Sequence, residues 1–223
     1  MEAIFWARKL TIEKINLELN KNRPKQAWVS GQELEIDNSW GVRYPVRIHM
    51  FDLTQYSNKT IDHMVMSYVK IGQNNEINIF LNDVNNHCWK RFFIFKELIH
   101  VVSSNKENAT VGSKHLLEVL TNLHDQNFKT SDSAFWAEED AKFGAIEILL
   151  PKELVEQIEN QYESFEDITD KDIYEIAHKY KIPKVIVKLR LKDAEVRDYF
   201  ARAYKSSLYH NAQFMPVYKK HAG

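Results

Sequence analysis

The sequence predicts an α+β fold in which the strands come early and the helices come late. Between residues 45 and 82, apolar and polar residues alternate in three runs, as they do in half-buried strands. After residue 86, apolar residues recur every three or four positions, which is the spacing of helices. The chain has 223 residues, of which 44% are hydrophobic, so we expect one domain, or one domain with a small appendage, around a buried core.

The three predicted strands are Pro45–Phe51, Ile61–Ile71 and Ile77–Asn82. Residues 72–75, Gly-Gln-Asn-Asn, are typical of a turn, so we expect the second and third strands to pair as a hairpin in a small antiparallel sheet. Upstream of these strands, residues 3–20 predict a helix, and residues 22–44 predict a loop with at most a short strand.

The predicted helices make the second half of the chain mostly helical. They cover residues 86–104, 113–123, 134–150, 152–160, 173–180 and 184–203. Ser113 and Asp170 are the expected N-caps, and Lys181-Ile182-Pro183 is expected to form the turn between the last two helices. We expect a domain of residues 1–160, followed by a helical region of residues 161–223.

One apolar helix, residues 92–102, contains three polar residues. Lys96 and His100 are four apart and therefore share a helix face, with Glu97 beside them. Burying such side chains is unfavourable unless they find partners. Their spacing is that of the zinc-peptidase motif His-Glu-x-x-His, with a lysine in place of the first histidine.

In a zinc peptidase the two histidines bind the metal from one helix face, and the glutamate takes a proton from metal-bound water. His100 is therefore a candidate metal ligand, and Glu97 is a candidate catalytic base. Lys96 cannot bind a metal while it is protonated, and its charge would repel the ion. We expect zinc to be absent or weakly bound.

Three stretches resemble the ImmA/IrrE family of metallo-endopeptidases, in the family's order along the chain. Residues 91–100, Arg-Phe-Phe-Ile-Phe-Lys-Glu-Leu-Ile-His, resemble its "RFTxAHELGH" helix. Residues 138–151 resemble its second signature, "ExEAxxFAxxLLxP", in a register that places Asp140 on the third metal ligand. Residues 176–191 resemble its helix-turn-helix-like element, "LAxxFxVSxxAxxxRL".

The resemblance implies a zincin-like peptidase domain, followed by a helical part with a helix-turn-helix-like element. It also implies a protein partner, because family members typically act on helix-turn-helix repressors of mobile elements or stress responses. Three departures separate this chain from the family. The first ligand is Lys96, the glycine before the last ligand is Ile99, and the third ligand is shortened to Asp140.

These departures lead to the hypothesis of a catalytically impaired peptidase that still binds a regulatory protein. In this hypothesis the Lys96 ammonium lies between Glu97 and Asp140 in the former metal pocket, where it replaces part of the zinc charge. The alternative for the same residues is that Lys96 extends to solvent and leaves the pocket empty.

Two other functions remain open. An active zinc endopeptidase would use Glu97 as its base, with His100, Asp140 and a substitute ligand on the metal. A DNA-binding regulator would use residues 176–220, because eleven Lys or Arg and three Asp or Glu lie between residues 179 and 220. The same charges also fit a solvated helix that balances the acidic stretch before it.

The remaining features concern where the protein works. The formal net charge of −1 gives no electrostatic indication of nucleic-acid or membrane binding by the whole molecule. Cys88 is the single cysteine, so no intrachain disulfide can form and a reducing compartment is expected. Residues 1–6 do not follow a signal-peptide pattern, and no apolar run approaches the roughly 20 residues of a membrane span. We expect a cytoplasmic protein without a membrane partner, in which Cys88 is a buried, inert thiol.

Overall fold

The computed structural model describes Ile4, Ala7 and six longer segments of the chain. The segments are residues 34–37, 43–51, 67–72, 77–83, 85–103 and 133–206. The chain divides into two compact units, one of residues 24–142 and one of residues 1–23 with 143–223. We call them the sheet unit and the helical unit, and we describe each by itself. The domain boundary expected at residue 160 stays a prediction.

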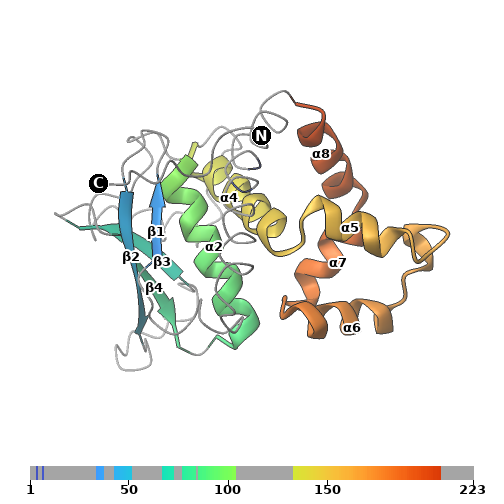
Figure 1. Cartoon of the computed structure of the whole chain (residues 1–223), viewed down its shortest axis with the longest axis horizontal. Helices are drawn as coiled ribbons and strands as arrows, with labels where there is room; N and C mark the ends of the chain where they lie inside the picture. The colour runs from blue at the N-terminus through green and yellow to red at the C-terminus, as the bar shows by residue number, and fades with distance from the viewer. Residues whose placement is uncertain are drawn as a thin grey trace, which may run out of the picture. The chain divides into compact units, whose positions relative to one another are not determined.

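The fold is mixed α+β, as predicted, and the sheet unit contains a four-stranded sheet in the order β1-β2-β4-β3 (Figure 1). Its strands are β1 (Leu34–Asp37), β2 (Arg43–Phe51), β3 (Ser67–Ile71) and β4 (Ile77–Asn82). The predicted hairpin is confirmed, because β3 pairs antiparallel with β4. The pair β1–β2 is also antiparallel.

The expectation of an antiparallel sheet is wrong for the central pair, because β2 and β4 run parallel, with Ile48 opposite Ile79. The apolar side of β4 explains its central place. Ile77, Ile79 and Leu81 have no exposed surface, so this strand gains most from neighbours on both sides. The hairpin partner β3 is left at the sheet edge.

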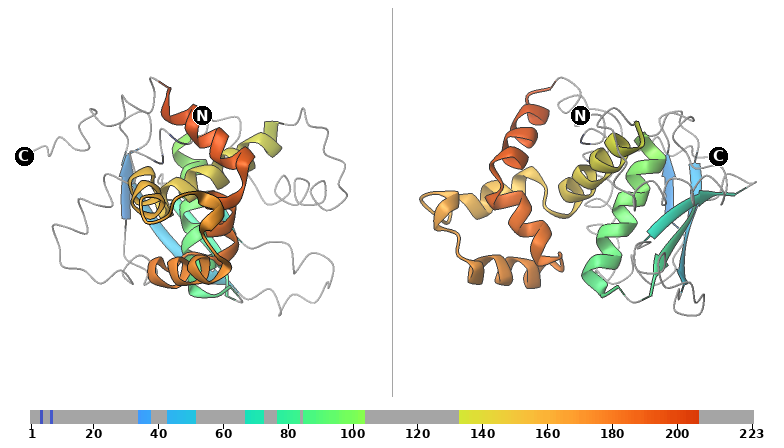
Figure 2. Two further views of the ribbon diagram at one scale, coloured as in Figure 1. Left: turned by 90° about the vertical axis from the view of Figure 1, so that its right-hand side faces the viewer. Right: turned by 180° about the vertical axis from the view of Figure 1, so that it is seen from behind.

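Helix α2 (His87–Ser103) follows β4 after a short turn, and it packs against β3 and β4. Both Figure 1 and the right-hand view of Figure 2 show it lying along one face of the sheet. The Asn86 side chain begins the helix, because its Oδ1 accepts a hydrogen bond of 3.1 Å from the Trp89 amide. Ile94, Leu98 and Ile99 are at most 1% exposed, so the predicted apolar helix is confirmed as a core element.

Helix α4 (Ser133–Leu149) confirms the helix expected over residues 134–150. The boundary between the two units falls within it, after Lys142. Its small residues Ala141 and Ala145 are at most 1% exposed. Glu138 lies three positions before Ala141 and seven before Ala145, so it shares their helix face.

The helical unit contains five further helical segments, which begin after Pro151. They are α5 (Lys152–Glu159), the short 3₁₀ helix η3 (Phe165–Asp167), α6 (Asp170–Tyr180), α7 (Lys184–Lys192) and α8 (Ala194–Tyr204). Their core includes Ile173, Val187, Leu191 and Phe200, none of which has exposed surface. The turn between α6 and α7 lies where it was predicted, with Lys181 in the left-handed region at φ 55°.

Two local predictions in this unit are wrong. The cap of α6 is Thr169 and not Asp170, because Thr169 and Asp172 form a reciprocal capping box. The helix expected over residues 184–203 is two helices, because Asp193 ends α7 in an extended conformation and caps α8 through the Val196 amide at 3.0 Å.

Two predicted helices fall mainly beyond the described segments. The helix expected over residues 113–123, with its Ser113 cap, lies outside them altogether. Of residues 3–20, the structure describes Ile4 and Ala7, which are helical and fully buried. None of the helices in the described segments is long and apolar enough to cross a membrane.

Candidate functional site

The polar residues of α2 meet a carboxylate of α4 inside the sheet unit. The Lys96 Nζ atom lies 3.1 Å from Glu97 Oε1 and 2.8 Å from Glu138 Oε2. On the next turn of α2, His100 Nε2 lies 3.0 Å from Glu138 Oε1. We call Lys96, Glu97, His100 and Glu138, together with Ser67, the lysine cluster.

Ser67 on β3 completes the lysine cluster from the sheet. Its Oγ donates a hydrogen bond of 2.5 Å to Glu97 Oε1. Glu97 is 3% exposed, so its carboxylate would be costly to bury without these two donors. Ser67 thus provides a hydrogen bond to the Glu97 carboxylate, which α2 brings into the core.

The lysine cluster is more open on the side of α4. The side chains of Lys96 and His100 are 15% and 16% exposed, whereas that of Glu138 is 42% exposed. Glu138 therefore faces the cluster with both oxygens while part of its surface still meets solvent. The interaction is intermediate between a buried salt bridge and a surface one.

The electrostatics of the lysine cluster favour the charged forms of Lys96 and Glu138. Burial opposes the charged form of Lys96, but the attraction of Glu97 and then of Glu138 outweighs it and raises the pKa of Lys96 above its ordinary value. Burial likewise opposes the charged form of Glu138, but Lys96 and His100 lower its pKa well below the ordinary value. Lys96 is therefore a permanent ammonium at neutral pH, so it cannot act as a general base.

The structure corrects the expected partner of Lys96. The sequence hypothesis places its ammonium between Glu97 and Asp140, whereas the described contacts place it between Glu97 and Glu138. Positions 138 and 140 are two apart, so they point in nearly opposite directions on a helix and only one of them can face α2. The alternative in which Lys96 extends to solvent and leaves an empty pocket is wrong.

The same contacts test whether the cluster fits a zinc ion. Glu97, His100 and Glu138 are zinc-type donors, but the oxygens of both carboxylates contact the Lys96 ammonium. A metal at this point would sit against a fixed positive charge. Among the described residues, no group of three or more His, Cys, Asp or Glu side chains is arranged to hold a metal ion. We conclude that the lysine cluster as built does not fit zinc.

Sequence reasoning missed two members of the lysine cluster. Glu138 is the first acid of the same signature that suggested Asp140, so the motif contained it but did not choose between the two acids. Ser67 could be found from its position in β3, where it shares a sheet face with Val69 and Ile71. The roles of Glu97 as a catalytic base and of His100 and Asp140 as metal ligands stay predictions.

A second polar network lies inside the helical unit. Arg190 on α7 is 3% exposed, and its Nη2 donates a hydrogen bond of 2.6 Å to Tyr204 Oη. Tyr204 donates in turn to Glu147 Oε2, also at 2.6 Å, and Glu147 has no exposed surface. The guanidinium carbon of Arg190 stands 3.9 Å from the centre of the Phe200 ring. The network links a buried cation to a buried anion, and we regard it as structural.

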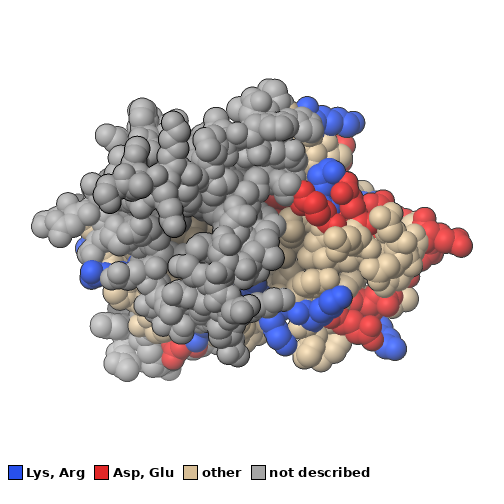
Figure 3. Space-filling view, viewed as in Figure 1, with Lys and Arg blue, Asp and Glu red and all other residues tan. Residues whose placement is uncertain are grey.

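The pair α6–α7 is the element predicted to resemble a helix-turn-helix. Lys184 and Lys188 are exposed on α7, and Lys188 lies 3.5 Å from Asp170 on α6. Figure 3 shows acidic groups interspersed with Lys and Arg on the visible face of the described helices, with no continuous basic surface there. DNA binding through residues 176–220 stays a prediction, of which residues 207–220 lie outside the described segments.

The cysteine prediction needs one correction. Cys88 is a free thiol, as expected for a single cysteine, but it is half-buried and not fully buried. It stands in the first turn of α2.

Comparison of the chain with protein-family models, with curated proteins and with solved structures found no match. The resemblance to ImmA/IrrE metallo-endopeptidases therefore depends on the three sequence stretches alone.

Proposed function

We propose that this protein is a catalytically impaired, zincin-like peptidase that binds a regulatory protein, such as a helix-turn-helix repressor, without cleaving it. One observation carries the proposal. The Lys96 ammonium lies 3.1 Å from the carboxylate of Glu97 and 2.8 Å from that of Glu138. In a zinc peptidase, a His-Glu-x-x-His helix and a facing acid would hold a metal ion at this place.

The chemistry of the lysine cluster supports the absence of hydrolysis. A metallopeptidase needs a Lewis acid to polarise the peptide carbonyl and a free carboxylate to take a proton from water. Lys96 is only a hydrogen-bond donor and accepts no proton at neutral pH. Glu97 Oε1 contacts both Lys96 and Ser67, so two donors of the chain already bind this oxygen of the candidate base.

The same arrangement supports a stable fold without a metal. Two carboxylates and an imidazole brought together without a cation would raise the energy of the folded state. Lys96 supplies the missing charge from within the chain, so the helix, the sheet and the facing helix can stay packed. Such a protein can retain a binding surface after losing the reaction, and the family resemblance suggests a repressor as its partner.

The first experiment restores the missing ligand. Purified wild-type protein and the variant Lys96→His are dialysed against zinc, and their metal content is measured by mass spectrometry. We expect negligible zinc in the wild type and about one zinc per chain in Lys96→His, because histidine recreates the motif opposite His100 and Glu138.

The control is the double variant Lys96→His/Glu138→Gln, which should bind much less zinc because an amide replaces the facing carboxylate. For the partner, a purified helix-turn-helix repressor is mixed with the wild type and followed by size-exclusion chromatography and by mass spectrometry of the fragments. A complex without fragments supports the proposal. Stoichiometric zinc in the wild type, or chelator-sensitive cleavage of the repressor, would overturn it.

A further inference from the structure

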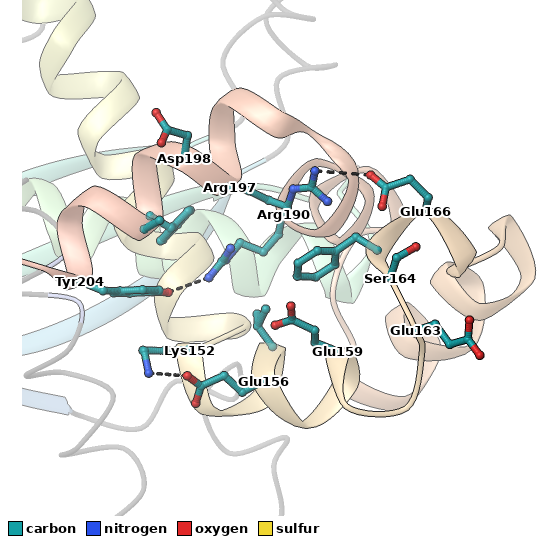
Figure 4. Close-up of a pocket in the computed structure, with 14 residues that line it drawn as sticks. Lys152, Glu156, Glu159, Glu163, Ser164, Glu166, Arg190, Arg197, Asp198 and Tyr204 are labelled. Atoms are coloured by element: carbon teal, nitrogen blue, oxygen red, sulfur yellow. Dashed lines mark hydrogen bonds and ion pairs between the residues drawn. The ribbon is translucent and has the colours of Figure 1, made fainter.

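The helical unit contains an open groove with a volume of about 610 Å³, lined by α5, α8 and the residues around η3 (Figure 4). Its floor is apolar and includes Val155, Phe165 and Phe200. Val155 is 6% exposed and Phe200 has no exposed surface, so both side chains belong to the close-packed core beneath the groove. The main-chain oxygens of Phe165 and Glu166 accept hydrogen bonds from Lys192 Nζ, which fixes the η3 side.

The margin of the groove is acidic. Five carboxylates line it, against three cationic side chains. Lys152 pairs with Glu156, Arg197 lies 3.6 Å from Glu166, and Asp198 lies 3.1 Å from Arg202.

Two carboxylates of the groove are left without a cation among the described residues, those of Glu159 and Glu163. In Figure 4 the Glu159 carboxylate points into the groove on the side of Arg190, and Glu163 stands at the outer margin. Both residues are exposed. The groove therefore has a surplus of negative charge directed at solvent.

The third cation of the groove, Arg190, provides a second and independent observation. Its Nη2 donates to Tyr204, which donates in turn to Glu147, and no ion pair joins Arg190 to Glu159 or Glu163 among the described residues. Its Nε–H, however, is buried and has no hydrogen-bond partner in the described structure. A buried N–H without an acceptor costs free energy, and a bound carbonyl oxygen would recover it.

We propose that this groove binds a basic segment of a partner protein, with lysine or arginine side chains on Glu159 and Glu163 and apolar side chains on the floor. A main-chain carbonyl of that segment is the acceptor for Arg190 Nε. A small cation would leave the apolar floor unused, and the excess carboxylates disfavour a nucleic acid backbone. All residues that line the groove belong to the helical unit, so loss of peptide binding would not bear on the function proposed for the lysine cluster.

The probe is a fluorescein-labelled amphipathic peptide of about 14 residues, built from lysine and leucine at helical spacing. Its binding to the full-length protein is measured by fluorescence anisotropy at two salt concentrations. We expect saturable binding that weakens in Glu159→Gln/Glu163→Gln by about tenfold, which corresponds to about 1.4 kcal/mol. The charge-matched control Glu175→Gln/Glu195→Gln removes two exposed carboxylates outside the groove and should retain wild-type affinity.

A second pair of variants tests the groove by its shape. Ala201→Arg places a large side chain in the groove, whereas Ala194→Arg makes the same change on an exposed residue of the same helix outside it. We expect loss of binding in the first and not in the second, with both proteins folded by circular dichroism. Equal effects of groove and control variants, failure of the peptide to bind, or full competition by spermine alone would overturn the proposal.

Discussion

Lys96 is the residue on which the interpretation of the site depends. Read in the sequence, it is a single mismatch in a zinc motif. In the structure it is the shared cation of two carboxylates, and its charged form is favoured although burial opposes it. A lysine at the position where the zinc motif has its first histidine therefore forms a salt-bridged cluster with its own internal balance of charge.

The variant Lys96→Met tests how much this balance contributes to stability. Removing the ammonium leaves Glu97, which is 3% exposed, with Ser67 as its remaining partner in the cluster. Breaking a fully buried pair costs about 3–5 kcal/mol, and the 42% exposure of Glu138 reduces that figure, so we expect a loss of about 2 kcal/mol. Urea denaturation followed by circular dichroism measures the free energy of unfolding.

Two further variants make this measurement specific. Lys96→Met/Glu97→Gln should recover part of the loss, because the uncompensated buried charge is gone. Lys171→Met removes a lysine that is 83% exposed and should change the free energy of unfolding by less than about 0.5 kcal/mol. If the double variant is no more stable than Lys96→Met, burial of an unpaired Glu97 is not the cause.

At the scale of elements, the single Asp193 decides the architecture of the last part of the chain. Apolar spacing continues through residues 184–203 and predicts one helix, but Asp193 takes an extended conformation and accepts from the Val196 amide. The extended backbone of Asp193 ends α7 and its side chain begins α8, which allows α8 to place Phe200 and Tyr204 against Arg190 of α7. Asp is common at N-caps because its oxygen satisfies an amide that the helix cannot.

We expect Asp193→Ala to lower the free energy of unfolding by about 1 kcal/mol, which is the usual contribution of an N-cap. Asp193→Asn should retain most of it, because the amide oxygen can still accept the hydrogen bond. The comparison is Asp198→Ala on the same helix, which removes an exposed pair with Arg202 and should cost about 0.3–0.5 kcal/mol. Equal losses for Asp193→Ala and Asp198→Ala in thermal or urea unfolding would contradict the capping role.

The strands and the helix around the lysine cluster could be predicted in part from the sequence. The hairpin β3–β4 and helix α2 were predicted because alternation and helical spacing are local patterns. The parallel pairing of β2 with β4 was not, because it joins strands that are distant in the sequence and no turn sequence specifies it.

At the scale of the whole molecule, the charges of the lysine cluster predict a pH dependence of stability. The pKa of Glu138 is lowered in the folded state, so its contribution is complete above the ordinary value of 4.5 and is lost as the pH falls through the folded value. The pKa of Lys96 is raised, so its contribution is complete below 10.5 and is lost as the pH rises through the folded value.

The variant Glu138→Gln isolates the acid side of this dependence. We expect the wild type to be more stable than Glu138→Gln by a constant amount between about pH 6 and pH 9, and we expect this difference to shrink below about pH 4.5. Urea midpoints and slopes measured for both proteins across this range provide the comparison. A difference that stays constant down to pH 3 would show that folding does not lower the pKa of Glu138.

By itself, the sequence determined the α+β class, the hairpin, the main helices and the residues Lys96, Glu97 and His100, because local periodicity and spacing along one helix suffice for these. The tertiary structure alone decided that the sheet is mixed, that Glu138 and not Asp140 faces Lys96, and that Ser67 joins them. These depend on which faces of distant segments meet. Packing selects those faces, and two acids that are two positions apart look equivalent until the partner helix is in place.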